Sequence, residues 1–164
     1  MKNILGIDIG RVIIDRSNDK TSTSLFGNNF LNGTPSPYAY ERILQLNEVF
    51  HKDIYLISKA SIENERRVLL WLEHQKFYQK TGIDRSRISF CRELSGKKDI
   101  CIGLGVTHFV DDNPRVLSHL VGIVPKLYLF NPGEEELTTS GENISFYSIV
   151  RDWNECYQKI VESI

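Results

Sequence analysis

Acidic residues that directly follow apolar runs are the feature of this sequence most suited to chemistry. The opening segment, MKNILGIDIGRVIID, is apolar over residues 4–7, then presents the carboxylate of Asp8 and breaks at Gly10. Further along, HFVDDNP ends an apolar run on two adjacent carboxylates, Asp111 and Asp112. Adjacent carboxylates at a buried edge repel each other unless a cation or another partner offsets them. Oxygen ligands of this kind suit Mg²⁺, which binds one or two carboxylates together with waters and substrate phosphate.

A hydroxyl group occupies an equivalent position after a third apolar run, because residues 54–57 lead directly to Ser58. In open α/β sheets, ligands bind at the carboxyl ends of the strands. If these three strands are neighbours, the side chains of Asp8, Ser58 and Asp111 converge on one site. The alternative is that each residue caps the helix that follows it, with DDNP as an N-capping turn. Three polar residues at equivalent positions favour the shared site.

Two lysines, Lys97 and Lys98, open the short segment that precedes the Asp111 strand. A lysine there could reach a phosphate group or keep the Asp8 carboxylate ionised. The alternative for each lysine is a solvated surface position. The SGKK sequence is not a phosphate-binding P-loop, because Cys91 stands where that motif requires its first glycine.

Short apolar runs without alternation must position these residues, and such runs are typical of strands buried on both faces. The expected strands lie within residues 4–7, 54–57, 87–94, 105–111 and 124–130. Helical patterns lie between and after them, within residues 40–46, 62–78, 97–104, 113–122 and 149–164. Strands that alternate with helices predict a parallel, three-layer α/β sheet. No repeat or second domain is evident, so we expect one domain over residues 1–164.

Local signals mark the ends of three of these helices. Gly82, after Thr81, ends the helix that begins near residue 62, and Gly105 stops the next one. Asn113 and Pro114 begin the following helix as its N-cap and first helical residue.

Composition narrows the class of protein. The 164 residues are 41% apolar and 25% charged, with a formal net charge of -1, which fits one domain with a sizeable core. This charge gives no electrostatic case for binding nucleic acid or a membrane surface. The apolar runs are far shorter than the roughly 20 residues of a membrane helix, and no secretory pattern opens the chain. Three cysteines without metal-binding or paired spacing suit reduced thiols, so we expect a cytoplasmic protein.

One polar stretch, residues 15–37, is rich in Gly, Asn, Ser and Thr. A loop of this length inside a compact domain is usually functional or disordered. Because it begins a few residues after Asp8, it could lie over the site to which Asp8 belongs. The alternative is a disordered connector.

Taken together, Asp8 in GIDIGRV, Ser58 in YLIS, Lys97 in GKKDIC and the acidic pair in HFVDD resemble the four motifs of the haloacid dehalogenase-like hydrolases. The order and spacing of the motifs match that family over most of the chain. The resemblance implies a Rossmann-like sheet with the Asp8 strand at its centre and a short cap-like insertion at about residues 15–37. It also implies that Asp8 is a nucleophile, which forms an aspartyl-phosphate that water then hydrolyses. A carboxylate nucleophile of this kind splits one difficult displacement into two easier ones.

The resemblance implies a role for each motif residue. Asp8 would attack phosphorus with one oxygen and bind Mg²⁺ with the other. Ser58 would hydrogen-bond a phosphoryl oxygen, and Lys97, preferred over Lys98 from its offset to the acidic pair, would neutralise charge on the nucleophile and the phosphate. The other Mg²⁺ ligands would be the Gly10 carbonyl oxygen, the Asp111 carboxylate and, through water, the Asp112 carboxylate.

Gly10 departs from the family pattern, in which a second Asp at this position protonates the leaving group. General acid catalysis contributes about 10²- to 10⁴-fold, so this absence should affect poor leaving groups most. Arg11 or Asp15 could assist, although nothing in the sequence positions either of them.

The sequence therefore predicts a Mg²⁺-dependent phosphohydrolase that acts on an unidentified phosphomonoester, either a small molecule or a phosphorylated macromolecule. The alternative is a catalytically silent relative that binds a phosphorylated ligand or protein partner. A receiver-like phospho-acceptor domain ranks third, because its paired acids would follow the first strand. The sequence does not specify the oligomeric state.

Overall fold

The core of the structure is a six-stranded sheet in which every neighbouring pair of strands is parallel. The computed structural model describes residues 1–164. The strand order is β3-β2-β1-β4-β5-β6, so β1 lies inside the sheet between β2 and β4. The strands are β1 (Leu5–Ile7), β2 (Ile54–Lys59), β3 (Ile88–Cys91), β4 (His108–Asp111), β5 (Lys126–Phe130) and β6 (Tyr147–Val150).

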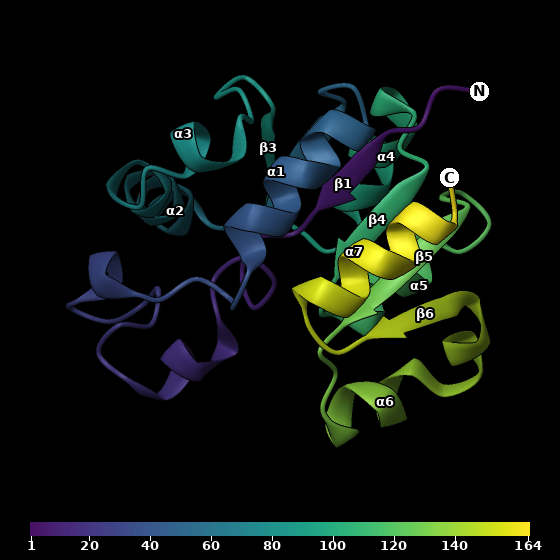
Figure 1. The fold of residues 1–164 in the computed structure, drawn as a ribbon. Helices are drawn as coiled ribbons and strands as arrows, with labels where there is room; N and C mark the ends of the chain where they lie inside the picture. Colours follow the sequence, from purple (N-terminus) through teal and green to yellow (C-terminus); the bar gives the residue numbers. More distant parts are fainter.

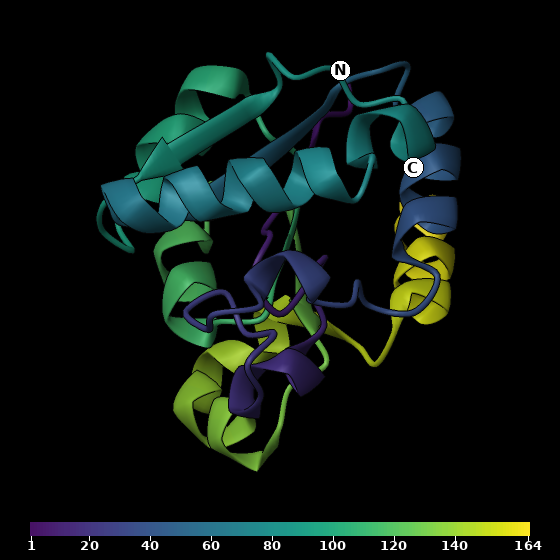
Figure 2. The same cartoon turned by 90° about the vertical axis from the view of Figure 1, so that its left-hand side faces the viewer.

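Helices cover both faces of this sheet, which confirms the expected three-layer α/β architecture (Figures 1 and 2). The larger apolar core lies between one face and four helices: α1 (Ala39–Val49), α2 (Ile62–His74), α3 (Phe77–Thr81) and α7 (Trp153–Glu162). The smaller core lies on the other face, beneath α4 (Gly96–Leu104) and α5 (Pro114–Leu120). α6 (Glu134–Ser140) packs beside α5. None of these helices has the length and apolar character that crossing a membrane requires.

The helix ends that the sequence predicted from glycine, asparagine and proline lie at the expected residues. The Asn113 side chain accepts a hydrogen bond from the backbone N–H of Arg115, with Pro114 in the first turn of α5. Gly82 and Gly105 end α3 and α4 with positive φ angles of 74° and 72°, a conformation that favours glycine.

Three elements differ from the sequence prediction. The helix expected over residues 62–78 is divided into α2 and α3, because Lys76 adopts a left-handed conformation at φ 55°. The helix expected from residue 149 begins at Trp153, and Ile149 belongs to the sixth strand, which was not expected. The helix over residues 134–140 was also missed, and its first turn consists of three glutamates without an apolar pattern.

The polar stretch over residues 15–37 is an ordered part of the fold. It contains two short 3-10 helices, η1 (Arg16–Lys20) and η2 (Phe30–Asn32). Buried Asn18 joins its two ends, because the side-chain amide donates to the Asp15 and Thr34 carbonyl oxygens and its own oxygen accepts from the Thr34 N–H. The alternative of a disordered connector is therefore wrong, and the segment lies below α2 in Figure 2.

Close packing at β1 gives a test of this arrangement. A Cβ atom at Gly6 would lie 2.5 Å from Phe109 Cδ2, whereas a Cβ at Gly103 in α4 would meet no atom within 4 Å. We expect Gly6→Ala to lower the free energy of unfolding by about 1–3 kcal/mol through overpacking. Gly103→Ala should instead raise it by about 0.5–1 kcal/mol, because alanine favours a helix. Denaturant unfolding of both variants measures the difference, and a stable Gly6→Ala protein would contradict this packing.

Candidate active site

Strand register brings the polar ends of three neighbouring strands to one edge of the sheet. Ile7 pairs with Leu56 of β2 on one side and with Val110 of β4 on the other, so Asp8 follows β1 at the level of Asp111. The Asp8 backbone N–H donates to the Val110 carbonyl oxygen at 3.0 Å. Ser58 lies near the carboxyl end of β2, beside β1. The three residues expected to converge therefore lie on adjacent strands at the same edge.

The side chain of Lys97, which belongs to α4, contacts two of these residues, Asp8 and Asp111. Lys97 lies in the first turn of α4, where its side chain is only 2% exposed. Its Nζ atom donates to Asp8 Oδ1 at 2.8 Å and to Asp111 Oδ2 at 2.7 Å. The adjacent Lys98 is exposed. The structure therefore places Lys97, and not Lys98, among the acidic residues.

Burial and charge together set the proton affinities in this cluster. Burial alone would lower the pKa of Lys97, but the carboxylates of Asp111 and Asp8 outweigh it and hold that pKa above its usual value. Burial, and then repulsion from Asp8, raise the pKa of Asp111 to about 6 although Lys97 opposes the change. The pKa of Asp112 is raised to about 9 by burial and by the charges of Asp111 and Asp8. One lysine therefore does not balance three carboxyl groups.

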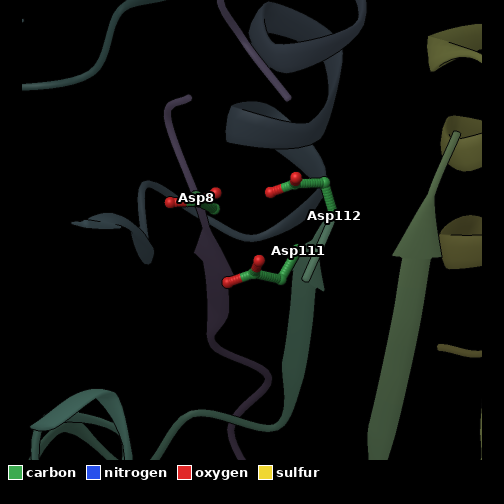
Figure 3. A group of neighbouring side chains, drawn as sticks. All are labelled: Asp8, Asp111 and Asp112. Atoms are coloured by element: carbon green, nitrogen blue, oxygen red, sulfur yellow. The ribbon is translucent and has the colours of Figure 1, made fainter. Parts of the chain in front are cut away.

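The donor set of the cluster fits a divalent cation. One carboxylate oxygen from each of Asp8, Asp111 and Asp112 lies within 4.8 Å of the others. The three side chains come from the carboxyl ends of β1 and β4 (Figure 3). Opposite ligands of Mg²⁺ lie about 4.2 Å apart, a distance that falls within this upper bound. The raised pKa values indicate the same deficit of positive charge. These residues could hold Mg²⁺.

Hydrogen bonds distinguish the two adjacent carboxylates. Asp111 is fully buried, and it accepts from Lys97 at one oxygen and from the Asn113 backbone N–H, at 2.9 Å, at the other. Asp112 is half-buried and accepts no hydrogen bond from a backbone N–H or a basic side chain. Asp112 therefore has the greater freedom to turn toward a cation.

A cavity of about 660 Å³ opens over this cluster. It is lined by the four charged residues described above, by Gly10 and by Ser58, whose side-chain hydroxyl makes no hydrogen bond within the chain. Ligand pockets in proteins typically measure about 300–1,000 Å³. The six residues to which the family resemblance assigned a role thus meet at one cavity: Asp8, Gly10, Ser58, Lys97, Asp111 and Asp112.

The two residues considered as substitutes for the missing acid have other partners. Arg11 lines the cavity with a left-handed backbone at φ 61°, and its Nε donates to Asp19 Oδ2 at 2.7 Å. Asp15 caps η1 by accepting from the Ser17 backbone N–H at 3.3 Å, and it does not line the cavity. A Cβ atom at Gly10 would meet no atom within 4 Å, so the position of the missing carboxylate is open space.

The cavity also has walls that the sequence analysis did not identify. Phe26 and Leu25 of the 15–37 segment line it, together with Asn64 and Val68 of α2. The segment reaches this position because Arg67 Nη1 donates to two of its carbonyl oxygens and Trp71 Nε1 donates to a third. Its polar composition signalled a functional loop, but not which of its residues face the acidic cluster.

Comparison with known proteins gives a curated relative, which the chain matches over part of its length, and a solved structure of related fold. No protein-family model matches the chain. A protein of Oceanobacillus iheyensis that bears the name "Putative nucleotidase" is 27% identical over 122 residues, which cover 74% of this chain and 59% of that protein. The chain thus spans about three-fifths of the length of this relative. Among solved structures, a de novo designed Rossmann 3x3 fold protein matches with 16% identity and a TM-score of 0.46, over 80% of this chain and 88% of that one.

Loss of the central ammonium group provides a test of the electrostatics. Lys97→Met would leave buried carboxylates without their partner, and we expect it to lower the free energy of unfolding at pH 7 by about 3–5 kcal/mol. The loss should shrink at pH 5, where Asp111, with its raised pKa, takes up a proton more readily. Lys98→Met is the matched control and should change stability by less than about 0.5 kcal/mol. Equal effects of the two substitutions would contradict this reading of the cluster.

Proposed function

We propose that this protein is a phosphohydrolase of the haloacid dehalogenase-like type, which uses Mg²⁺ to hydrolyse a phosphomonoester. The observation that carries the proposal is the contact of Lys97 Nζ with both Asp8 and Asp111, beside a third carboxylate and at the carboxyl edge of a parallel sheet. The similarity to a protein that bears the name "Putative nucleotidase" supports a hydrolase that acts on phosphate esters.

The chemistry begins with Asp8, which directly follows the inner strand β1. Its free oxygen attacks phosphorus, the bond from phosphorus to the ester oxygen breaks, and an aspartyl-phosphate forms. Water then attacks the same phosphorus and releases inorganic phosphate, which restores the Asp8 carboxylate. Because one oxygen of Asp8 accepts from Lys97, the ammonium group holds the carboxylate in place without blocking the other oxygen.

Charge on the transferring phosphoryl group requires positive and hydrogen-bonding partners. Lys97 lies at the base of the cavity and offsets the charge of Asp8 and of the phosphate. Ser58, whose hydroxyl is free, donates a hydrogen bond to a phosphoryl oxygen. Bound Mg²⁺ would draw negative charge from the phosphate, and Asp8, Asp111, Asp112 and the Gly10 carbonyl oxygen would hold it.

The protein has no acidic side chain at position 10 that could protonate the departing alcohol. No side chain occupies the open space beside Gly10, so a leaving group takes its proton from water. Activated esters, whose leaving groups need no proton, are therefore the substrates on which this site should work best.

The second candidate is a protein that binds a phosphorylated ligand without hydrolysing it. The observation that favours it is the same open space at Gly10, which the family pattern fills with an acid. The retained Lys97 contacts with Asp8 and Asp111 favour the enzyme. Turnover separates the two candidates.

The first test is phosphate release from p-nitrophenyl phosphate. We expect turnover that EDTA abolishes and Mg²⁺ restores, and Asp8→Asn should reduce kcat/KM to below about one thousandth of the wild-type value because the nucleophile is removed. Asp99→Asn, which changes an exposed acid on α4, is the control and should keep full activity. Absent turnover with phosphate still bound would favour the silent candidate, and absence of both would refute the proposal.

A gain of function tests the missing acid. Gly10→Asp would place a carboxyl group in the open space beside Asp8, and we expect kcat for an alkyl phosphate to rise by about 10²-fold. The p-nitrophenyl ester should gain far less, because its leaving group needs no proton. Gly10→Asn supplies a side chain of the same size without an acid, so equal gains from both variants would show that proton transfer is not the cause.

A further inference from the structure

Phe26 belongs to the cavity wall, but the proposed phosphate chemistry gives its side chain no role. It is 75% exposed, more than any other aromatic side chain of the chain. It lies in the 15–37 segment and lines the same cavity as Asp8. An exposed phenyl ring contributes little to the core, and apolar surface beside a polar cavity is typical of a ligand-binding wall.

The backbone on both sides of Phe26 is held in place. Arg67 Nη1 of α2 donates to the carbonyl oxygen of Leu25 at 2.9 Å and to that of Gly27 at 3.0 Å. The same guanidinium lies over the Phe30 ring at 4.8 Å, and its Nε pairs with Glu63 at 3.4 Å. One side chain thus fixes the residues directly before and after Phe26.

The turn that carries Phe26 is also closed on itself. The Gly27 N–H donates to the Ser24 carbonyl oxygen, and the Asn29 N–H donates to that of Ser22, both at 2.9 Å. A Cβ atom at Gly27 would lie 2.1 Å from the Ser22 carbonyl oxygen, so the backbone can close in this way only with glycine. The ring of Phe26 is therefore presented at the cavity by a braced turn.

The surroundings of the ring suit a flat ligand with polar edges. Leu25 and Val68 supply apolar surface to the cavity, and Ser24 and Asn64 supply a hydroxyl and an amide that can meet ring nitrogen or oxygen atoms. Aromatic rings pair with one another by offset stacking or edge-to-face contact. Because the acidic cluster takes the phosphate, the part of the substrate that meets Phe26 is its alcohol.

We propose that Phe26 binds a planar aromatic ring in the alcohol part of the substrate, so that the site prefers phosphomonoesters of the nucleoside 5′-monophosphate kind over sugar phosphates without a ring base. This inference rests on the proposed function for the position of the phosphate. Phe26 acts in substrate selection and takes no part in the phosphoryl transfer.

Binding to the Asp8→Asn protein tests the inference without any turnover. Calorimetry with Mg²⁺ present would compare adenosine 5′-monophosphate with ribose 5-phosphate, in which a hydroxyl group replaces the base. We expect adenosine 5′-monophosphate to bind more tightly by about 5- to 150-fold, since stacking of a base on an aromatic side chain has this magnitude. Adding Phe26→Ala should bring the ratio of the two Kd values close to one, and Phe26→Tyr should preserve it.

The matched control is Phe146→Ala, which removes another exposed phenyl ring, 59% exposed, that does not line the cavity. It should leave the ratio unchanged. Equal Kd values for the two ligands, no binding of either ligand, or a ratio that survives Phe26→Ala would each overturn the inference. Turnover of acetyl phosphate by the wild-type protein, which needs no ring, reports on the proposed function alone, so the two failures can be told apart.

Discussion

A buried ammonium group between two carboxylates is the interaction on which the geometry of this edge of the sheet depends. Removal of an ion from water costs several kcal/mol, which only close and well-aligned partners can offset. Lys97 meets that requirement by touching Asp8 and Asp111 at once, which ties α4 to β1 and β4. The helix can come this close because Gly96 precedes the lysine: a Cβ there would lie 2.7 Å from Cys91 Cβ. Gly96 therefore lets α4 pack against the end of β3, and Lys97 reaches the two carboxylates from that position.

Much of this edge could be predicted from sequence, because apolar runs without alternation identify the inner strands and the residues after them must share an edge. The choice between Lys97 and Lys98 depends on the rotation of a short helix, which a nine-residue segment barely specifies. Other elements had weak or misleading signals. The run Ile149–Val150 continues into the apolar pattern of α7, although Asp152, which accepts from the Glu155 N–H, marks the true start of that helix.

Backbone-directed contacts explain why the 15–37 segment was harder to interpret. The side chains of Arg67 and Trp71 donate hydrogen bonds to backbone carbonyl oxygens of the segment. Every residue type has such an oxygen, so the sequence of the segment does not indicate these contacts. The break between α2 and α3 has a similar cause. Lys76 adopts a left-handed conformation without being glycine or asparagine, because the packing of Phe77 and Tyr78 into the core decides the direction of the chain.

The anchoring of the 15–37 segment also bears on how molecules enter and leave the cavity. At one end Arg16 donates to the Asn131 carbonyl oxygen at 3.0 Å and pairs with Glu136 of α6, while Arg67 holds the other part from α2. A segment fastened to two separate helices is a fixed rim and not a hinged flap. Passage through such a rim requires no slow rearrangement of the backbone, in contrast to enzymes whose lids open at each cycle. The residence time of a bound molecule would then follow from its own contacts with the wall.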